Sequence, residues 1–241
     1  MAGHSKWANI KHRKGAQDKK RGKLFTRCIK EIHVAVKENG DDINSNPRLK
    51  TAIQNAKGAN MPKDTIERAI KKASSSDSES YIEVNYEGYG PYGVAFFIEC
   101  TTDNINRTVA NIRAIFNKYN GELGKNGSLE FLFNRIGVFE IDKNIGNISR
   151  DELEMDLIDS GLEELHNFQD SYIITTNFEN FGSMQKRLEE LNITPKSSRV
   201  ERIALNLKKI KEEDTEKIFK MIEKFDDDDD VKEVYHNLEI T

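Results

Sequence analysis

The chain has 241 residues, which is more than a single domain usually contains, so two or three compact units are expected. Hydrophobic residues make up 37% of the sequence and charged residues 32%, which leaves enough apolar side chains for cores and excludes a wholly disordered chain. The sequence has neither the apolar segment of a signal peptide nor a run of about 20 apolar residues, so we expect a cytoplasmic protein without a membrane partner.

The net charge of −4 conceals a separation of sign along the chain. Residues 1–75 contain 18 Lys and Arg against 7 Asp and Glu, whereas the remainder contains 19 against 34. A basic segment gains affinity for nucleic acid by releasing counterions from the phosphate backbone, and an acidic body repels that backbone. We therefore expect nucleic acid to be the partner of the N-terminal part.

The first 23 residues show no sustained helical or strand periodicity and are predicted to form a mobile basic arm. Its lysines and arginines would neutralise phosphates, and Trp7 or His4 would stack on bases, although one aromatic side chain can also anchor the arm on the helices. The alternative is a tail that only promotes solubility. Ten arm residues are candidate nucleic-acid contacts: Lys6, Trp7, Lys11, His12, Arg13, Lys14, Lys19, Lys20, Arg21 and Lys23.

Three amphipathic helices follow the arm and predict a small bundle. Their apolar residues recur at helical spacing in the segments 24–36, 47–56 and 62–73. Asn46 with Pro47, and also Pro62, are typical helix starts, and Asn39-Gly40 is a typical stop. The third helix lacks a set of Asn, Gln and Arg at its N-terminus for reading base edges, so contact with the backbone or with folded RNA is favoured.

A polar stretch at residues 74–80 predicts a domain boundary, and beyond it strands and helices alternate. A hairpin is expected over 82–100, then a helix that ends near Gly121 and a third strand at 129–133. After a turn at 134–137, the order strand, helix, strand, strand, helix, strand up to residue 205 is the ferredoxin-like signature, and one more helix and strand follow it. Ser149 with Glu152 fits a capping box at the start of the first of these helices.

The predicted fold class is therefore α+β, with a basic three-helix bundle followed by two α/β ferredoxin-like sandwich domains, the third domain being inserted into the second. The arm and bundle are expected to occupy residues 1–75. The discontinuous second domain is expected to combine 81–135 with 207–241, and the inserted domain to occupy 137–205.

Candidate reactive residues are sparse. Cys28 and Cys100 lie in apolar-periodic segments and are expected to be buried thiols. The five His residues are scattered and no catalytic or metal-binding motif occurs, so we expect no enzyme, catalytic residue, metal, cofactor or small-molecule substrate. The run Asp226–Asp230 lacks the spacing of a calcium loop and is interpreted as a solvated turn. Asp103 and Asn104 are expected to cap a helix, with Arg107 as a further candidate phosphate contact.

The segments MAGHSKWANIKHRKGAQDKKRGKLFTRCIKEI and NPRLKTAIQNAKGANMPKDTIERAIKKA resemble the N-terminal part of the YebC/PmpR family. The resemblance continues through YEGYGPYGVAFFIECTTDNINRTVANIRAIFNKYNGELGKNGSLEFLFNRIGVF and returns at VYHNL, so it covers the whole chain, most closely up to Phe139. Phe131 and Phe133 stand where relatives often carry Trp, and TPKSSRVERIAL departs from the family pattern.

This resemblance implies a three-domain cytoplasmic protein of the kind described as a probable transcriptional regulatory protein that binds DNA. Related proteins, including the mitochondrial translational activator of cytochrome c oxidase subunit 1, act instead at the ribosome, where some relieve stalling on proline-rich nascent chains. DNA and ribosomal RNA both stay open as targets, because lysines neutralise either backbone. A metal-dependent nuclease that uses the acidic clusters is a third, less favoured hypothesis, and a monomer is expected.

Overall fold

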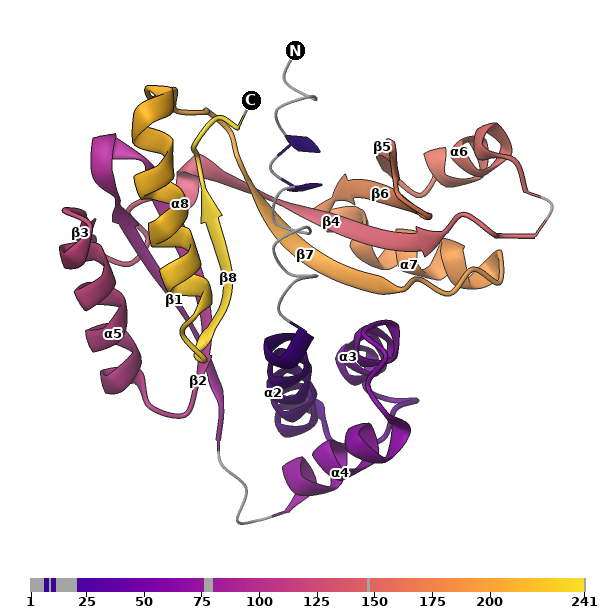
Figure 1. The fold of residues 1–241 in the computed structure, drawn as a ribbon. Coiled ribbons are helices and arrows are strands. Elements are labelled where there is room, and N and C mark those ends of the chain that lie inside the picture. The colour runs from indigo at the N-terminus through magenta and orange to yellow at the C-terminus, as the bar shows by residue number, and fades with distance from the viewer. Residues whose placement is uncertain (1–6, 9, 12–20, 76–79, 147, 241) are drawn as a thin grey trace.

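The computed structural model describes residues 7, 8, 10, 11, 21–75, 80–146 and 148–240. Three helices near the N-terminus are followed by two α/β sandwiches, each built on an antiparallel sheet of four strands (Figure 1). The predicted fold class is thus confirmed. The bounds 1–75, 81–135 with 207–241, and 137–205 for the three domains stay a prediction.

The N-terminal bundle packs around small and branched apolar residues, because its helices present the stripes that the periodicity predicts. Asn46, which is fully buried, joins two of the helices. Its side chain accepts a hydrogen bond from the Leu49 amide at 2.9 Å and donates to the carbonyls of Ala35 and Gly40 at 2.8 and 2.7 Å. The helices are α2 (Arg21–Asn39), α3 (Pro47–Gly58) and α4 (Lys63–Ser74).

The start of the chain differs from the predicted irregular arm wherever the structure describes it. Residues 7, 8, 10 and 11 are helical. Ile10 is 1% exposed and packs with Val138 and Ile173, on the face of the second sheet that is not covered by helices. An apolar residue embedded in a basic segment gives no periodicity, which explains why the sequence did not reveal this contact.

The first sandwich has the strand order β3-β1-β2-β8, with the β1–β2 hairpin at its centre. One face of this sheet carries Phe96 and Ile98, which pack on Phe116 of α5 and Phe225 of α8. Its elements are β1 (Ile82–Tyr89), β2 (Ala95–Thr102), α5 (Ile105–Lys118), β3 (Glu122–Leu123), α8 (Glu212–Asp226) and β8 (Val231–His236), with short 3₁₀ turns at Pro91–Gly93 and Glu130–Leu132.

The second sandwich has the strand order β5-β6-β4-β7, with α6 and α7 on one face, as the predicted βαββαβ signature requires. The capping box predicted at Ser149 and Glu152 is present at the start of α6. Its elements are β4 (Phe133–Asp142), α6 (Arg150–Ile158), β5 (Leu162–Phe168), β6 (Ser171–Asn177), a 3₁₀ turn (Phe178–Asn180), α7 (Phe181–Glu190) and β7 (Ser197–Ala204).

Two sequence predictions at the junction of the sandwiches are wrong. The strand expected at 129–133 is a 3₁₀ turn, and the turn expected at 134–137 is part of β4. Gly137 favoured a turn in the sequence, but it serves close packing: an added Cβ would lie 2.7 Å from Thr176 and 2.9 Å from Phe181.

Strands β4 and β7 are paired along their length and cross from one sandwich to the other (Figure 1). At the crossing, the guanidinium of Arg202 lies 3.9 Å from the ring centre of Phe97 and donates a 3.0 Å hydrogen bond to Glu99. A cation that stacks and pairs at once fixes the two sheets relative to each other.

Candidate nucleic-acid interface

The structure places only part of the predicted arm. Trp7, Lys11 and Lys23 are described, and Arg21 is described for its backbone as the first residue of α2. Lys11 is exposed to solvent. The other predicted contacts lie outside the described residues: Lys6, His12, Arg13, Lys14, Lys19 and Lys20.

Trp7 is held by the second sandwich. Its ring stacks on His166 with centroids 4.3 Å apart and the planes at 12°, and it meets Phe168 edge-on at 6.1 Å. His166 in turn lies 2.7 Å from Glu164. One face of the indole is therefore covered by the protein. Trp7 is anchored on the second sandwich rather than on the N-terminal helices.

Replacing His166 with Ala is expected to move the fluorescence emission of Trp7 to longer wavelength, because the indole loses the ring that covers one face. Trp7 is the single tryptophan of the chain, so the tryptophan emission reports on the surroundings of this one ring. Such aromatic pairs contribute about 0.5–1.5 kcal/mol, so a partial release is expected. The control is Asn167→Ala, which alters an exposed neighbour on the opposite face of β5. Equal spectra for both variants would show that Trp7 does not stack on His166.

The cations of α2 face the turn that connects α8 to β8. Lys23 Nζ donates to the carbonyl oxygens of Asp226, at 3.1 Å, and Asp227. Arg27 lies 3.6 Å from the carboxylate of Asp226. Lys30 Nζ donates to the carbonyl oxygen of Asp229 at 2.7 Å. Of the predicted contacts, Lys23 is thus occupied by the protein's own oxygens.

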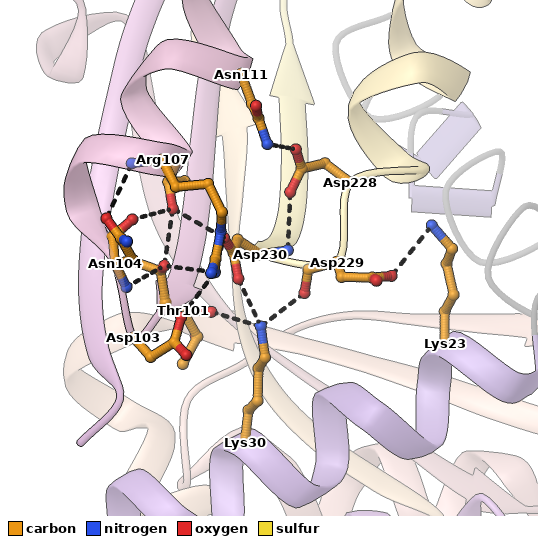
Figure 2. Close-up of polar contacts among 12 residues, drawn as sticks. Lys23, Lys30, Thr101, Asp103, Asn104, Arg107, Asn111, Asp228, Asp229 and Asp230 are labelled. Atoms are coloured by element: carbon orange, nitrogen blue, oxygen red, sulfur yellow. Dashed lines mark hydrogen bonds and ion pairs between the residues drawn. The ribbon is translucent and has the colours of Figure 1, made fainter. Parts of the chain in front are cut away.

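The interpretation of Asp226–Asp230 as a solvated turn is wrong for its last residue. Asp230 is 5% exposed and accepts hydrogen bonds from three side chains (Figure 2). These are Lys30 at 3.0 Å, Arg107 at 2.6 and 3.2 Å, and Thr108 at 2.9 Å. The acidic run therefore joins the bundle to the first sandwich, because its carboxylate binds a cation from each.

The electrostatics of this cluster follow from its geometry. Burial alone would raise the pKa of Asp230, but the hydrogen bonds from Arg107 and Lys30 lower it overall. The pKa of Arg107 is raised, chiefly by its bonds to Asp230 and to Asp103, which lies 2.7 Å away. Arg107, considered as a phosphate contact from the sequence, is bound within the protein instead, and Asn104 caps α5 as predicted.

A second charged cluster joins the bundle to the sheet. Lys232 of β8 lies 2.7 Å from Glu31 of α2 and 3.4 Å from Glu83 of β1, and Arg48 of α3 pairs with both carboxylates at 3.3 and 2.8 Å. Burial alone would raise the pKa of Glu31, but Lys232 and Arg48 lower it overall. The charged side chains on the side of the bundle that faces the body are thus paired with opposite charges of the body.

Helix α3 docks on the edge of β7 in the second sandwich. The Asn55 side chain donates to the carbonyl of Ser198 at 2.9 Å and accepts from the amide of the same residue at 2.7 Å. Gly58 follows one turn later, where a Cβ would lie 1.7 Å from the Lys196 carbonyl oxygen. The Asn55 side-chain amide therefore makes the two hydrogen bonds that a neighbouring strand would make with Ser198, and Gly58 permits the close approach of the helix to the strand.

The outward side of the bundle carries cations that project into solvent. Lys63 is exposed and pairs only at the surface with Glu67, at 3.6 Å. Arg68 is exposed and donates to the Asp64 carbonyl at 3.1 Å. The exposed basic residues of α4 and the end of α3 are Lys57, Lys63, Arg68, Lys71 and Lys72.

A cleft of about 1380 Å³ opens between the bundle and the two sheets. Its lining includes Arg48, Lys232 and Arg199 but also Glu31 and Glu140. Because cations and carboxylates alternate there, the cleft presents no single sign of charge to a polyanion.

Among the described residues, no group of three or more His, Cys, Asp or Glu side chains is placed to hold a metal ion. Cys28 and Cys100 are both buried, as predicted, and burial raises the pKa of Cys28 to about 11. Over the same part of the chain, no helix is long and apolar enough to cross a membrane.

Comparison with known proteins covers both halves of the chain. Residues 5–76 match the family model described as TACO1/YebC protein N-terminal domain, and residues 81–238 match that described as TACO1/YebC second and third domain. A crystal structure of a conserved hypothetical protein from Aquifex aeolicus is similar, with a TM-score of 0.80 and 38% identity, over 92% of this chain and 91% of that one.

Several curated proteins are similar over nearly their whole length, and each is named a probable transcriptional regulatory protein. One from Amoebophilus asiaticus is 52% identical, covering 99% of this chain and 98% of its own. One from Geobacillus kaustophilus is 48% identical, with the same coverage. One from Bacillus subtilis is 47% identical, covering 98% of this chain and 99% of its own.

Proposed function

The chain belongs to the TACO1/YebC family, and from this we propose that it regulates gene expression by binding nucleic acid through its basic N-terminal part, with DNA as the first candidate. The names of its relatives support a regulatory role, and the family is of a regulatory rather than an enzymatic type. We further propose that the protein acts in the cytoplasm as a monomer, without a cofactor.

One observation carries this proposal: the bundle is two-sided in charge. Its inward cations, such as Lys30 and Arg48, are matched by carboxylates of the body. Its outward cations, such as Lys57, Arg68 and Lys71, are exposed on α3 and α4. A surface that presents cations away from the body suits a phosphate backbone, because the body carries an excess of carboxylates that disfavours a polyanion.

In this proposal ten residues of the arm extend the surface, and the lysines and arginines among them contact phosphates. The ten residues are Lys6, Trp7, Lys11, His12, Arg13, Lys14, Lys19, Lys20, Arg21 and Lys23. Trp7 can offer a base only the face that His166 does not cover. Phosphate contacts fix register without reading sequence, so any sequence preference must come from other contacts or from the shape of the nucleic acid.

RNA, in particular ribosomal RNA, is a second candidate target with an observation of its own. The residues that begin α4 are Pro62, Lys63 and Asp64, and the Arg68 guanidinium donates to the Asp64 carbonyl and the Thr65 hydroxyl. This helix start therefore offers no Asn, Gln or Arg set for base edges in a major groove. Recognition by backbone and shape is the usual mode for folded RNA.

Changing Lys19, Lys20 and Arg21 together to Ala is expected to weaken nucleic-acid binding by about tenfold. The slope of the logarithm of affinity against the logarithm of salt concentration should also become shallower, by about 0.9 for each phosphate of B-DNA that the variant no longer neutralises. The measurement is fluorescence anisotropy with a labelled DNA duplex and a labelled RNA at several salt concentrations.

The matched control for this triple variant is Lys209→Ala, Lys211→Ala and Lys220→Ala, which removes the same charge from exposed side chains of the body. An unchanged affinity and slope in the arm variant would refute the role of the arm. An equal loss of affinity in both variants would show that the effect comes from the net charge of the protein and not from the arm.

Sedimentation of the protein from lysate at moderate salt, with and without RNase and DNase, separates the two targets. RNase-sensitive migration with ribosomes would support the translational role. Absence from ribosomes together with DNase-sensitive association would support the transcriptional role.

A further inference from the structure

Three cations of α2 form a row on one face of the helix, hereafter the α2 row. Lys23, Arg27 and Lys30 are spaced four and three residues apart, so they lie on one side over about 10 Å of helix axis. All three face the acidic turn, residues 226–230, and bind its carbonyl or carboxylate oxygens. A nucleic-acid strand offers anionic oxygens at about 3.4 Å of rise per nucleotide, so the row matches a few consecutive phosphates.

The acidic turn has contacts within the body that do not depend on the α2 row. Asn111 of α5 donates to Asp228 at 2.9 Å, and the Asp228 carboxylate accepts from the Asp230 amide at 2.9 Å (Figure 2). Arg107 and Thr108, also on α5, bind the Asp230 carboxylate. If α2 moved away, Asp230 would keep these partners, whereas Lys30 would need another anion.

The contacts differ in exposure along the row. The Lys30 and Asp230 side chains are 10% and 6% exposed, whereas Lys23 is 30% and Asp229 84% exposed, with 3.8 Å between their charged atoms. Exposed pairs of this kind are weak and are screened by salt, so a polyanion can compete for the outer end of the row.

We propose that the α2 row is a second phosphate-binding face, which the acidic turn occupies in the closed arrangement of the protein and which nucleic acid takes over when the bundle moves away from the turn. The turn acts as an internal substitute for phosphates, because it presents several anionic and carbonyl oxygens to the same three cations. This inference rests on the proposed function and adds regulation to it, since affinity depends on how firmly the turn holds α2.

The double variant Asp227→Asn with Asp229→Asn tests this inference, because it removes two exposed charges of the turn and leaves Asp228 and Asp230 in place. Its affinity for a labelled DNA duplex and a labelled RNA is expected to rise by about three- to tenfold over the unchanged protein. The control is Glu212→Gln with Glu213→Gln at the other end of α8, which changes net charge equally and lies beyond a Debye length from the turn.

Lys23→Ala gives a second readout. In the unchanged protein it removes both an interaction that closes the turn on α2 and an interaction with phosphate, so affinity should change little. In the Asp227→Asn, Asp229→Asn background it should abolish most of the increase in affinity, since there Lys23 has lost both carboxylates and keeps only its bonds to the carbonyl oxygens of the turn, which compete more weakly with phosphate.

The outcomes separate this inference from the proposed function. If the unchanged protein binds nucleic acid and both double variants bind equally well, the acidic turn does not compete and the inference is overturned while the proposed function stands. If the unchanged protein and all variants fail to bind either nucleic acid at low salt, the proposed function fails and the inference falls with it. An increase in affinity that is specific to the turn variant and that Lys23→Ala abolishes supports the inference.

Discussion

Replacing Asp230 with Ala is expected to lower the free energy of unfolding by about 3 kcal/mol, the largest stability effect that we expect of any single side chain. The Asp230 carboxylate is buried and accepts from Lys30, Arg107 and Thr108. Its removal leaves the mostly buried ammonium of Lys30 without its carboxylate partner, and an uncompensated buried charge costs more than the ion pair contributes. Urea unfolding followed by circular dichroism measures the change.

Asp229→Ala is the matched control, because the Asp229 side chain lies in the same run but is 84% exposed. We expect it to change the free energy of unfolding by no more than about 0.5 kcal/mol. If the two variants were equally stable, Asp230 would contribute no more than a surface carboxylate, and the acidic run would be a solvated turn throughout.

The same variant should alter the response of stability to acid. The folded-state pKa of Asp230 is lowered overall, so its contribution is fully present above the unfolded value of about 3.9 and is lost as pH falls through the lower folded value. The difference in unfolding free energy between the unchanged protein and Asp230→Ala should therefore shrink below about pH 4. A difference that is constant between pH 7 and pH 3 would contradict the charged state of this carboxylate.

The fold could be predicted from the sequence where local patterns decide it. The helix starts at Asn46-Pro47 and Pro62 and the capping box at Ser149 depend on neighbours within a few residues, and all three are present in the structure. The βαββαβ order likewise determined the second sheet, because helix and strand periods differ along the chain. Gly137 led to the wrong prediction of a turn at 134–137, because a turn and a close approach of two chain segments both favour glycine.

The candidate site could be predicted less well, because the pattern of charges in a sequence does not show which charged side chains pair with each other in the fold. The excess of cations in residues 1–75 marked the bundle, but it could not separate Lys30 and Arg48, which bind the body, from Arg68 and Lys71, which face solvent. The acidic run drew attention by its composition, yet the role of Asp230 depends on residues more than a hundred positions away. A cation row at helical spacing together with a distant acidic run is the signal that could have suggested the pairing.

Replacing Gly58 with Ala is expected to detach α3 from β7 and to lower the free energy of unfolding by about 1–3 kcal/mol. An added Cβ would lie 1.7 Å from the Lys196 carbonyl oxygen, which belongs to backbone and cannot rotate away. The helix must retreat, and the paired hydrogen bonds between Asn55 and Ser198 lengthen or break with it. Hydrogen exchange at the Ser198 amide and thermal unfolding measure the two consequences.

The direction of this effect is diagnostic, because Gly→Ala in a helix ordinarily stabilises a protein by about 0.5–1 kcal/mol. Gly22→Ala in α2 is the matched control, since nothing lies within 4 Å of the added methyl group there, and it should be neutral or stabilising. Should Gly58→Ala stabilise the protein as Gly22→Ala does and leave the Ser198 amide protected, α3 would not dock on β7. Opposite signs for the two glycines would establish that the bundle is held against the inserted sheet by backbone contact as well as by charge.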